Sequence, residues 1–576
     1  MDQVLSSNPQ IDFTSLLMAT TDQNLVAEAE EKIRQYEGDN IYLFLKGLAN
    51  EIQDEQKPPT SRQVAGLLLY RSLTSTDSVQ KARKIERWLS FPEEFRLQIK
   101  NMSLKGLASK VREICSSSAQ VVSAIAVIEI PRGQWTELIN KLLGQIQDQT
   151  SEVKESILRC LGFICQDIPD IKCIQDYSDA ILTAVVSGMN QNQGEAVMLA
   201  ATNALNNSLF FAQKNFEKEN ERNYIMEVVC QMISVGNHEI RLKALECIIN
   251  ISEYYYKYLQ PYMERIFGLT IRLMADSIDE EEVKMAIEFW ATICDIEISF
   301  RYNKFQPDKI NLQLTRQASH HIVPVIIRIL EQKDEEFQQE DFSRILAAAD
   351  LLSKITQEVD KQIIDDIIKY MNENISSQDW HKRDAAIHSF GLILNEQSIN
   401  KTQTQTLQLL PVIMKMLLSD QSEIVKNTAS WTICQITKFH KVIVIQNVEN
   451  VVNNLLQAFQ SPKIALAVGE MFQPYLVETM NLSVLAAQQK SNQDGLQIKD
   501  PEDFIQNLQE AILMLWTYII QGLINDNKIQ LFQQYVEFVM SFVTLSVGNA
   551  TSDLQLSSQY NPHQNTQFIF GVNVPI

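Results

Sequence analysis

A short phrase recurs about every 43 residues along this chain, and its period constrains the fold more than any other feature. The phrase is usually an apolar residue followed by a cation, and it opens a helical run rich in small residues. It occurs at Val153-Lys154, Val197-Met198, Ile240-Arg241, Val283-Lys284, Lys382-Arg383 and Val425-Lys426. The first three intervals are 44, 43 and 43 residues, and the last is 43. This period predicts an all-α solenoid of HEAT or armadillo repeats, whose stacked helix pairs bury a continuous core.

Composition and charge restrict the function classes. Only 17 glycines and 15 prolines occur in 576 residues, which suits helices. A net charge of −21 argues against binding to nucleic acid or to an anionic membrane, because both need basic patches. An acidic curved surface instead suits basic protein partners, although it also keeps a large protein soluble. No signal peptide and no uninterrupted apolar stretch of about 18 residues is found, so no membrane span is expected.

The residue types that carry chemistry are scattered. The eight cysteines include no CxxC pair, which predicts reduced core residues in a cytosolic or nuclear protein. The chain has no P-loop, dinucleotide-binding glycine pattern, HExxH or GxSxG. The adjacent pair His320-His321 faces apart on a helix. We therefore expect no enzyme activity, no cofactor and no metal site.

The predicted repeats are regular over part of the chain only. Residues 28–107 form more variable helices, 108–460 form helix pairs, and 461–547 form further helices of uncertain phase. The tail 548–576 is rich in Gln, Asn and Ser and is predicted to be disordered. Pro324 and Pro411 are expected near the start of apolar helices, where a missing N–H costs little.

Two segments interrupt the period. A polar insertion is expected at 298–319, where one repeat is longer than the others. An acidic turn at 334–341 joins helices expected at 322–330 and 345–355, and it carries five carboxylates in eight residues. Such a run is either a solvated surface or a clamp for a basic partner.

Several phrases, in the same order along the chain, resemble the importin-β family of karyopherins. They include VAGLLLYRSLTS (64–75), EIPRGQWTELI (129–139), LAATNALNNSL (199–209), DWHKRDAAIHSFG (379–391) and NTASWTICQI (427–436). The resemblance implies a HEAT-repeat superhelix with an importin N-terminal module at 28–107. It also implies a nuclear import receptor of the cytoplasm, nucleus and nuclear pore. Its implied partners are Ran·GTP, FG nucleoporins, and importin-α or basic nuclear localisation signals.

The resemblance implies nucleoporin grooves between neighbouring helices, where phenylalanines of FG repeats bind. A phenylalanine ring needs a groove lined by aliphatic and aromatic atoms. The matching positions are Leu182, Thr183, Val186, Glu221, Tyr224, Ile225, Tyr262 and Leu269. Some of them must be plain core residues, because every amphipathic helix needs an inward stripe.

The resemblance also implies that acidic segments bind the basic face of Ran·GTP. The family's acidic loop is a nearly pure acidic run that ends in Trp. Here Gln338 and Gln339 interrupt the run, and Phe342 stands at the Trp position. The candidates are Asp276, Asp279, Glu280, Glu281, Asp334, Glu335, Glu336, Glu340 and Asp341.

For cargo, the resemblance singles out Trp431, which matches a Trp that stacks on Arg side chains of the importin-β-binding segment of importin-α. The Trp of the next repeat is missing, with Glu470 nearest to its place. The phrase IALAVGEMFQPYL (464–476) resembles a repeat much nearer the family's C-terminus. Several repeats are therefore expected to be absent at a junction near residue 464. A shortened homologue and a faulty gene model or isoform both fit.

Three functions remain open at this stage. The first is a nuclear import receptor for Ran·GTP, FG nucleoporins and basic cargo. The second is a structural HEAT scaffold, such as an adaptor that assembles a phosphatase or a kinase. The third is a truncated importin-β-like regulator that lacks full cargo binding. Nucleoporin grooves together with an acidic loop favour the first, because a generic scaffold needs neither.

Overall fold

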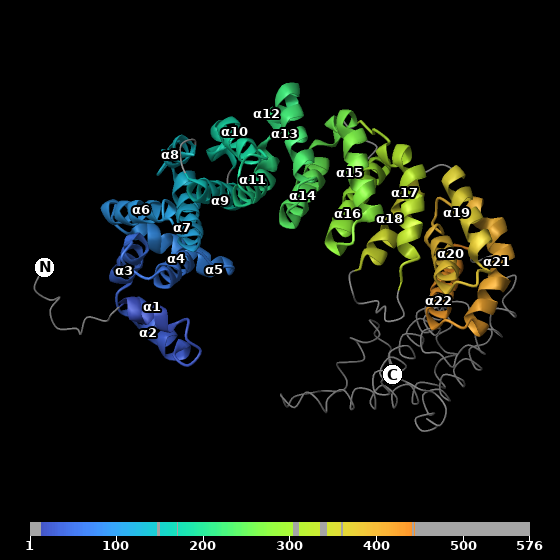
Figure 1. The fold of residues 1–576 in the computed structure, drawn as a ribbon, viewed down its shortest axis with the longest axis horizontal. Helices are drawn as coiled ribbons and strands as arrows, with labels where there is room; N and C mark the ends of the chain where they lie inside the picture. The colour runs from blue at the N-terminus through green and yellow to red at the C-terminus, as the bar shows by residue number, and fades with distance from the viewer. Residues whose placement is uncertain are drawn as a thin grey trace, which may run out of the picture. The chain divides into compact units, whose positions relative to one another are not determined.

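The computed structural model describes residues 13–146, 150–169, 171–302, 310–333, 343–358, 361–440 and 443. Every regular element in these ranges is a helix, and none of their residues lies in a strand (Figure 1). The prediction of an all-α HEAT-repeat solenoid is therefore confirmed at the level of the helix pairs. The acidic turn at 334–341 and the predicted segments 461–547 and 548–576 lie outside the described residues.

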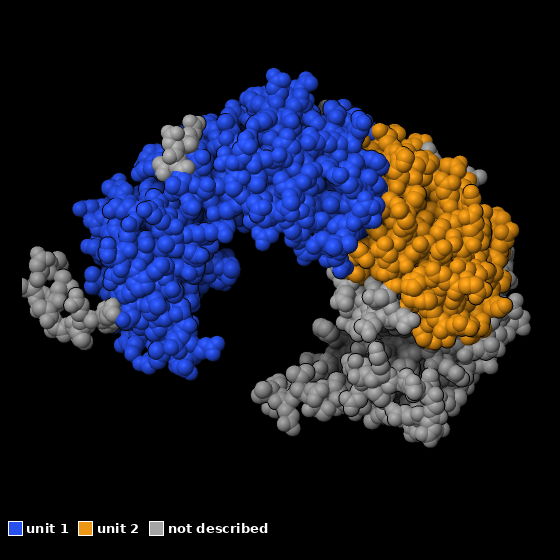
Figure 2. Space-filling view, viewed as in Figure 1, with its two compact units in different colours: residues 1–296, 305–312 blue, residues 297–304, 313–576 orange. Residues whose placement is uncertain are grey.

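The chain divides into two compact units (Figure 2). Unit 1 comprises residues 1–296 and 305–312. Its helices are α1 (Phe13–Ala19), α2 (Val26–Asp39), α3 (Ile41–Gln53), α4 (Pro59–Leu73), α5 (Ser78–Ser90), α6 (Glu93–Leu107), α7 (Arg112–Glu129), α8 (Leu138–Gln145), α9 (Ser151–Asp167), α10 (Ser178–Gly188), α11 (Glu195–Ser208), α12 (Gln213–Glu217), α13 (Glu219–Met232), α14 (His238–Tyr255), α15 (Met263–Asp276) and most of α16 (Glu280–Tyr302). Short 3-10 turns are η1 (Ile130–Arg132), η2 (Ile171–Cys173), η3 (Gln175–Tyr177), η4 (Leu209–Phe211), η5 (Tyr256–Tyr258) and η6 (Gln260–Tyr262).

Unit 2 comprises residues 297–304 and 313–576. Its described helices, besides the end of α16, are α17 (Leu314–Leu330), α18 (Arg344–Glu358), α19 (Lys361–Asn374), α20 (Trp380–Leu392), α21 (Ile399–Ser419) and α22 (Glu423–Phe439). They form three helix pairs, in which α17 packs on α18, α19 on α20, and α21 on α22. The second helices α18, α20 and α22 also pack on one another in that order. This is the stacking that the period predicts.

Unit 1 is built in the same way (Figure 1). The second helices of successive pairs are α4, α7, α9, α11 and α14, and each packs on the next. The first helices of the pairs also meet in places, as α3 meets α6 and α13 meets α15. Each second helix therefore contacts both its own partner and its neighbours, and this explains why α9 buries residues around most of its circumference.

Small residues let helices approach closely, both between repeats and within one pair. A Cβ atom added to Gly162 on α9 would lie 3.2 Å from Cα of Ala204 on α11. Within one pair, a Cβ atom on Gly188 of α10 would lie 2.9 Å from Cβ of Ala201 on α11. Larger side chains at these four positions would push the helices apart. The small-residue runs of the recurring phrase are thus contact surfaces between repeats.

The recurring phrase itself marks the start of the second helices. Val197, Ile240, Val283 and Val425 lie in the first turn of α11, α14, α16 and α22, and each is at most 1% exposed. Each anchors the first turn of its helix in the core. One period is therefore one helix pair.

The structure corrects the expected positions of two prolines. Pro324 lies inside α17 and Pro411 inside α21, well after their starts. Both prolines are on exposed helix faces. Proline removes the hydrogen bond to the carbonyl four residues earlier, which here belongs to exposed His320 and Leu407. Water can satisfy those carbonyls, so the helices continue.

The expected insertion at 298–319 is also too long. Helix α16 continues to Tyr302, and α17 already begins at Leu314. The buried carboxylate of Glu297 accepts hydrogen bonds from the backbone N–H of Leu314 (2.6 Å) and of Thr315 (3.1 Å). A carboxylate there satisfies donors that a helix start leaves unpaired. This contact lets α17 start earlier than the sequence pattern predicts.

Candidate binding surfaces

The predicted nucleoporin residues lie on three consecutive first helices of unit 1: α10, α13 and α15, with the turn η6 before α15. They differ in burial, and Glu221 and Tyr262 are half-buried. Leu182, Val186, Ile225 and Leu269 are 3 to 8% exposed and belong to the core. Tyr224 is 52% exposed and Thr183 is also exposed, so these two are open to a partner.

Polar contacts join α10 to α13 beside these residues. Asn215 Nδ2 donates to Asp179 on α10 and to Glu221 on α13, each at 2.7 Å. Lys218 Nζ lies 2.9 Å from Glu221 and 3.4 Å from Asp179. Glu221 is therefore held between two helices, and we infer that it fixes their spacing.

A second set of contacts joins α13 to η6. Arg222 Nε donates to the hydroxyl of Tyr262 at 3.1 Å, and that hydroxyl donates to the side chain of Asn223. Next to this turn, the surface of η6 and α15 has an open depression of about 520 Å³. Leu269 is the one predicted nucleoporin residue that lines this depression. Its other lining residues are Pro261, Glu264, Arg265, Gly268 and Arg272.

The described part of the predicted Ran site is the turn between α15 and α16. Asp276, Glu280 and Glu281 are exposed there. Asp279 is half-buried, and its Oδ1 accepts the backbone N–H of Glu282 at 3.0 Å, which caps α16. The other candidates, Asp334, Glu335, Glu336, Glu340 and Asp341, lie outside the described residues.

His238, Asp279 and Glu282 gather at this turn, with one possible ligand atom from each within 4.8 Å of the others. A cation already contacts them, because the guanidinium of Arg241 on α14 binds Glu282. Burial alone would raise the pKa of Glu282, but hydrogen bonds from Arg241, His238 and Ser277 outweigh it and lower the pKa. We therefore interpret the cluster as an ion pair between repeats.

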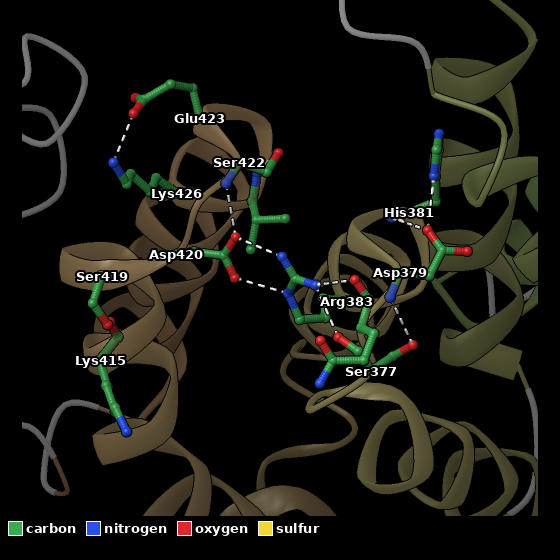
Figure 3. Close-up of polar contacts among 12 residues, drawn as sticks. Ser377, Asp379, His381, Arg383, Lys415, Ser419, Asp420, Ser422, Glu423 and Lys426 are labelled. Atoms are coloured by element: carbon green, nitrogen blue, oxygen red, sulfur yellow. Dashed lines mark hydrogen bonds and ion pairs between the residues drawn. The ribbon is translucent and has the colours of Figure 1, made fainter.

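The same ion pair recurs in unit 2 (Figure 3). Arg383 on α20 binds the carboxylate of Asp420, just before α22, through two parallel hydrogen bonds of 2.8 Å. Its Nη1 also donates to the carbonyls of Ser377 (2.8 Å) and Gln378 (3.1 Å). Arg241 likewise donates to the carbonyls of Val235 and Gly236. At these two positions the arginine of the recurring phrase thus ties one repeat to the next.

Sequence reasoning missed these arginine pairs. It used the cation only as a mark of the repeat. The usable signal was a carboxylate about one period later, since Glu282 follows Arg241 by 41 residues and Asp420 follows Arg383 by 37.

Trp431, the predicted cargo residue, is half-buried on α22 and faces α20. Its ring meets the imidazole of His388 edge to face, with centroids 5.1 Å apart. Nearby, the buried ammonium of Lys333 lies 2.6 Å from Asp384 on α20 and 3.4 Å from Thr428 on α22. Burial and then the Lys333 charge hold the pKa of His388 well below its ordinary value.

One described helix, α7 with the turn that follows it (Arg112–Arg132), is long and apolar enough to cross a membrane. Most of it is buried against α4, α6 and α9. Burial on several sides accounts for its apolar composition without a bilayer.

Stacked helix pairs of this kind define a HEAT-repeat solenoid protein. Two family models match the chain: Importin subunit beta-1-like, TPR repeats over residues 436–559, and IPO5-like, TPR repeats over residues 110–269. Importin subunit beta-1 of Arabidopsis thaliana is 34% identical over 74% of this chain and 50% of the relative. The Schizosaccharomyces pombe protein of that name is 33% identical over 73% and 49%.

Solved structures agree. Yeast importin-β (Kap95p) matches with a TM-score of 0.79 and 27% identity, over 97% of this chain and 66% of that one. A Kap95:Nup1 complex matches with a TM-score of 0.72 and 25% identity, over 96% and 74%. A structure in which Kap95p binding induces the switch loops of RanGDP to adopt the GTP-bound conformation matches at 0.69 and 25%, over 94% and 72%. The chain belongs to the importin-β family of karyopherins, and it spans about half the length of the curated relatives it matches.

Proposed function

We propose that this chain is a nuclear transport receptor that binds FG nucleoporins, Ran·GTP and a basic cargo segment. The observation that carries the proposal is the exposed aromatic side chain of Tyr224 on α13, with polar bridges to α10 on one side and to η6 on the other. An exposed aromatic ring suits a phenylalanine partner. The matches to Kap95p structures with Nup1 and with RanGDP support the same function.

Nucleoporin binding is best tested at Tyr224. We expect Tyr224→Ala to weaken binding of an FG-repeat peptide by about 1 kcal/mol, or about fivefold, through lost aromatic contact. Fluorescence anisotropy with a labelled peptide measures the change. Tyr254→Ala on α14 is the matched control, because Tyr254 is also 52% exposed. Equal binding by both variants would remove Tyr224 from the site.

Substitutions of the neighbouring core residues make a poorer test. Val186 and Ile225 are each 3% exposed, so an aspartate at either position would bury an unpaired carboxylate in the free protein. A loss of binding in those variants could come from unfolding or from loss of the groove, and the two causes could not be told apart.

The acidic turn at 334–341 is proposed to bind the basic face of Ran·GTP. Single exposed charge pairs contribute roughly 0–1 kcal/mol, so one substitution would be hard to measure. Changing its five carboxylates to amides together is expected to weaken Ran·GTP binding and to flatten its dependence on salt. Titrations at several salt concentrations measure that slope. An unchanged slope would identify the turn as solvated surface only.

Trp431 is proposed to stack on an arginine of a basic cargo segment, such as that of importin-α or a basic nuclear localisation signal. Its half-exposed ring on α22 supports this role. The ring stays partly open to solvent while its buried edge packs on α20.

A further inference from the structure

Trp431 packs against a position on α20 that has no side chain. A Cβ atom added to Gly391 would lie 2.4 Å from Cζ3 and 3.1 Å from Cε3 of the indole. Real Cβ atoms do not approach that closely, so the indole occupies the space that any other residue at 391 would need. We propose that Gly391 is a positioning residue for cargo binding, which sets the orientation of the Trp431 ring toward a guanidinium or ammonium group of a basic peptide. This inference rests on the proposed role of Trp431.

The indole is the group that would have to move. The next nearest atom to the added Cβ is Oγ1 of Thr432, at 3.1 Å. That hydroxyl is fully buried and lies 3.1 Å from the carbonyl of Ile387 and 2.8 Å from that of Thr428. Thr432 is thus held in place, whereas the partly exposed Trp431 has solvent on one side. A methyl group at 391 would therefore displace the ring.

His388 holds the ring from a second direction. Its imidazole stands at 90° to the indole, with the centroids 5.1 Å apart, which is a favourable edge-to-face geometry. His388 lies one helical turn before Gly391 on α20. Gly391 and His388 thus contact the indole from two directions.

Orientation matters because a cation binds over the face of an aromatic ring, within about 6 Å of its centroid. Arginine also stacks its planar guanidinium on the ring, which requires the ring plane to be accessible. A ring displaced from its seat presents a different plane to the peptide. Gly391 therefore affects peptide binding indirectly, through the orientation of the Trp431 ring, and does not contact the peptide itself.

The test compares Gly391→Ala with Gly144→Ala. Both glycines are the next-to-last residue of a helix, and an added Cβ at Gly144 meets nothing within 4 Å. The chain has six tryptophans, so labelling with 5-fluorotryptophan gives resolvable fluorine resonances, and Trp431→Phe assigns that of Trp431. We expect Gly391→Ala to shift the Trp431 resonance alone, and Gly144→Ala to leave it in place.

Binding is measured with a short fluorescein-labelled oligo-arginine peptide. Gly391→Ala is expected to weaken binding about threefold to tenfold, as Trp431→Ala does. In the Trp431→Ala background, Gly391→Ala should cause no further loss, because Gly391 acts through the ring. If Gly391→Ala lowers stability, adding Trp431→Phe should restore it, since the smaller ring leaves room for the methyl group.

The outcomes separate this inference from the proposed function. An unshifted Trp431 resonance, or an equal loss of binding with and without Trp431, would overturn the positioning role of Gly391. If the Trp431 resonance shifts in Gly391→Ala but peptide binding is unchanged in both Gly391→Ala and Trp431→Ala, Gly391 positions the indole. The cargo role of Trp431 would then be rejected. The positioning proposal would fall with that role.

Discussion

Glu129→Gln is expected to destabilise α6 and α7 by roughly 3–5 kcal/mol. The Glu129 side chain is fully buried, and its two oxygens lie 2.6 Å from Arg96 Nη1 and 2.7 Å from Lys100 Nζ. The Trp88 indole N–H donates to the same carboxylate at 3.0 Å. Removing the one negative charge leaves two buried cations without a counterion. Hydrogen exchange followed by mass spectrometry measures the effect as a lower opening free energy of α6 and α7.

The control for this prediction is Glu137→Gln, which makes the same chemical change at an exposed position near the start of α8. We expect it to alter exchange by less than about 0.5 kcal/mol. Local exchange is preferable to one unfolding midpoint, because stacked repeats need not unfold together. Equal protection of α6 and α7 in both variants would show that the Glu129 ion pairs contribute little.

The period of 43 residues was enough to predict the helix pairs, because buried residues such as Ile240 and Val425 begin the second helix of each pair. It could not predict where α17 begins. That boundary depends on Glu297 of α16, whose carboxylate accepts hydrogen bonds from the first backbone N–H groups of α17. Contacts of this kind join residues that no local pattern relates. Local propensity also places prolines at helix starts, whereas exposed Pro324 and Pro411 lie inside helices, where water can reach the carbonyls that lose a hydrogen bond.

The roles of the candidate site residues stay predictions, and the sequence alone did not give the burial of each residue. The predicted nucleoporin residues lie on neighbouring helices, but sequence alone did not separate exposed Tyr224 from buried Val186 and Ile225. Helical periodicity gives each helix one inward stripe, whereas first helices here are also covered by the first helices beside them. The packing of Trp431 against Gly391 could not be predicted either, because the two residues are 40 positions apart in the sequence. Gly391 makes room for the indole only because it has no side chain.

The ion pairs between repeats lead to the second large expected effect. Arg383→Met keeps much of the aliphatic length of the side chain but removes both hydrogen bonds to Asp420, which is 7% exposed. It also leaves the carbonyls of Ser377 and Gln378 without their donor. We expect a loss of roughly 2–4 kcal/mol, seen as faster hydrogen exchange at the starts of α20 and α22.

The same pair has a defined pH dependence. Burial by itself would raise the pKa of Asp420, but the hydrogen bonds from Arg383 and from the Ser422 N–H outweigh it, so the pKa is lowered below 3.8. A carboxyl whose pKa is depressed by folding stabilises the protein fully above its ordinary pKa. That contribution is lost as pH falls through the lowered pKa. Protection of α22 in the unsubstituted chain should therefore fall below about pH 3.8.

Lys382→Met tests whether the effect of Arg383→Met belongs to the ion pair. Lys382 is the adjacent, exposed residue of the same recurring phrase, and the substitution removes the same charge from the same helix turn. We expect it to change exchange at α22 by less than about 0.5 kcal/mol and to preserve the pH dependence. Arg383→Met should instead flatten the pH dependence, because Asp420 then loses the partner that lowers its pKa. If both variants lost protection from hydrogen exchange equally, the total charge on α20 would explain the result. The specific contact between Arg383 and Asp420 would then not be needed. A loss confined to Arg383→Met would establish that Arg383, in the recurring phrase, joins its repeat to the next one.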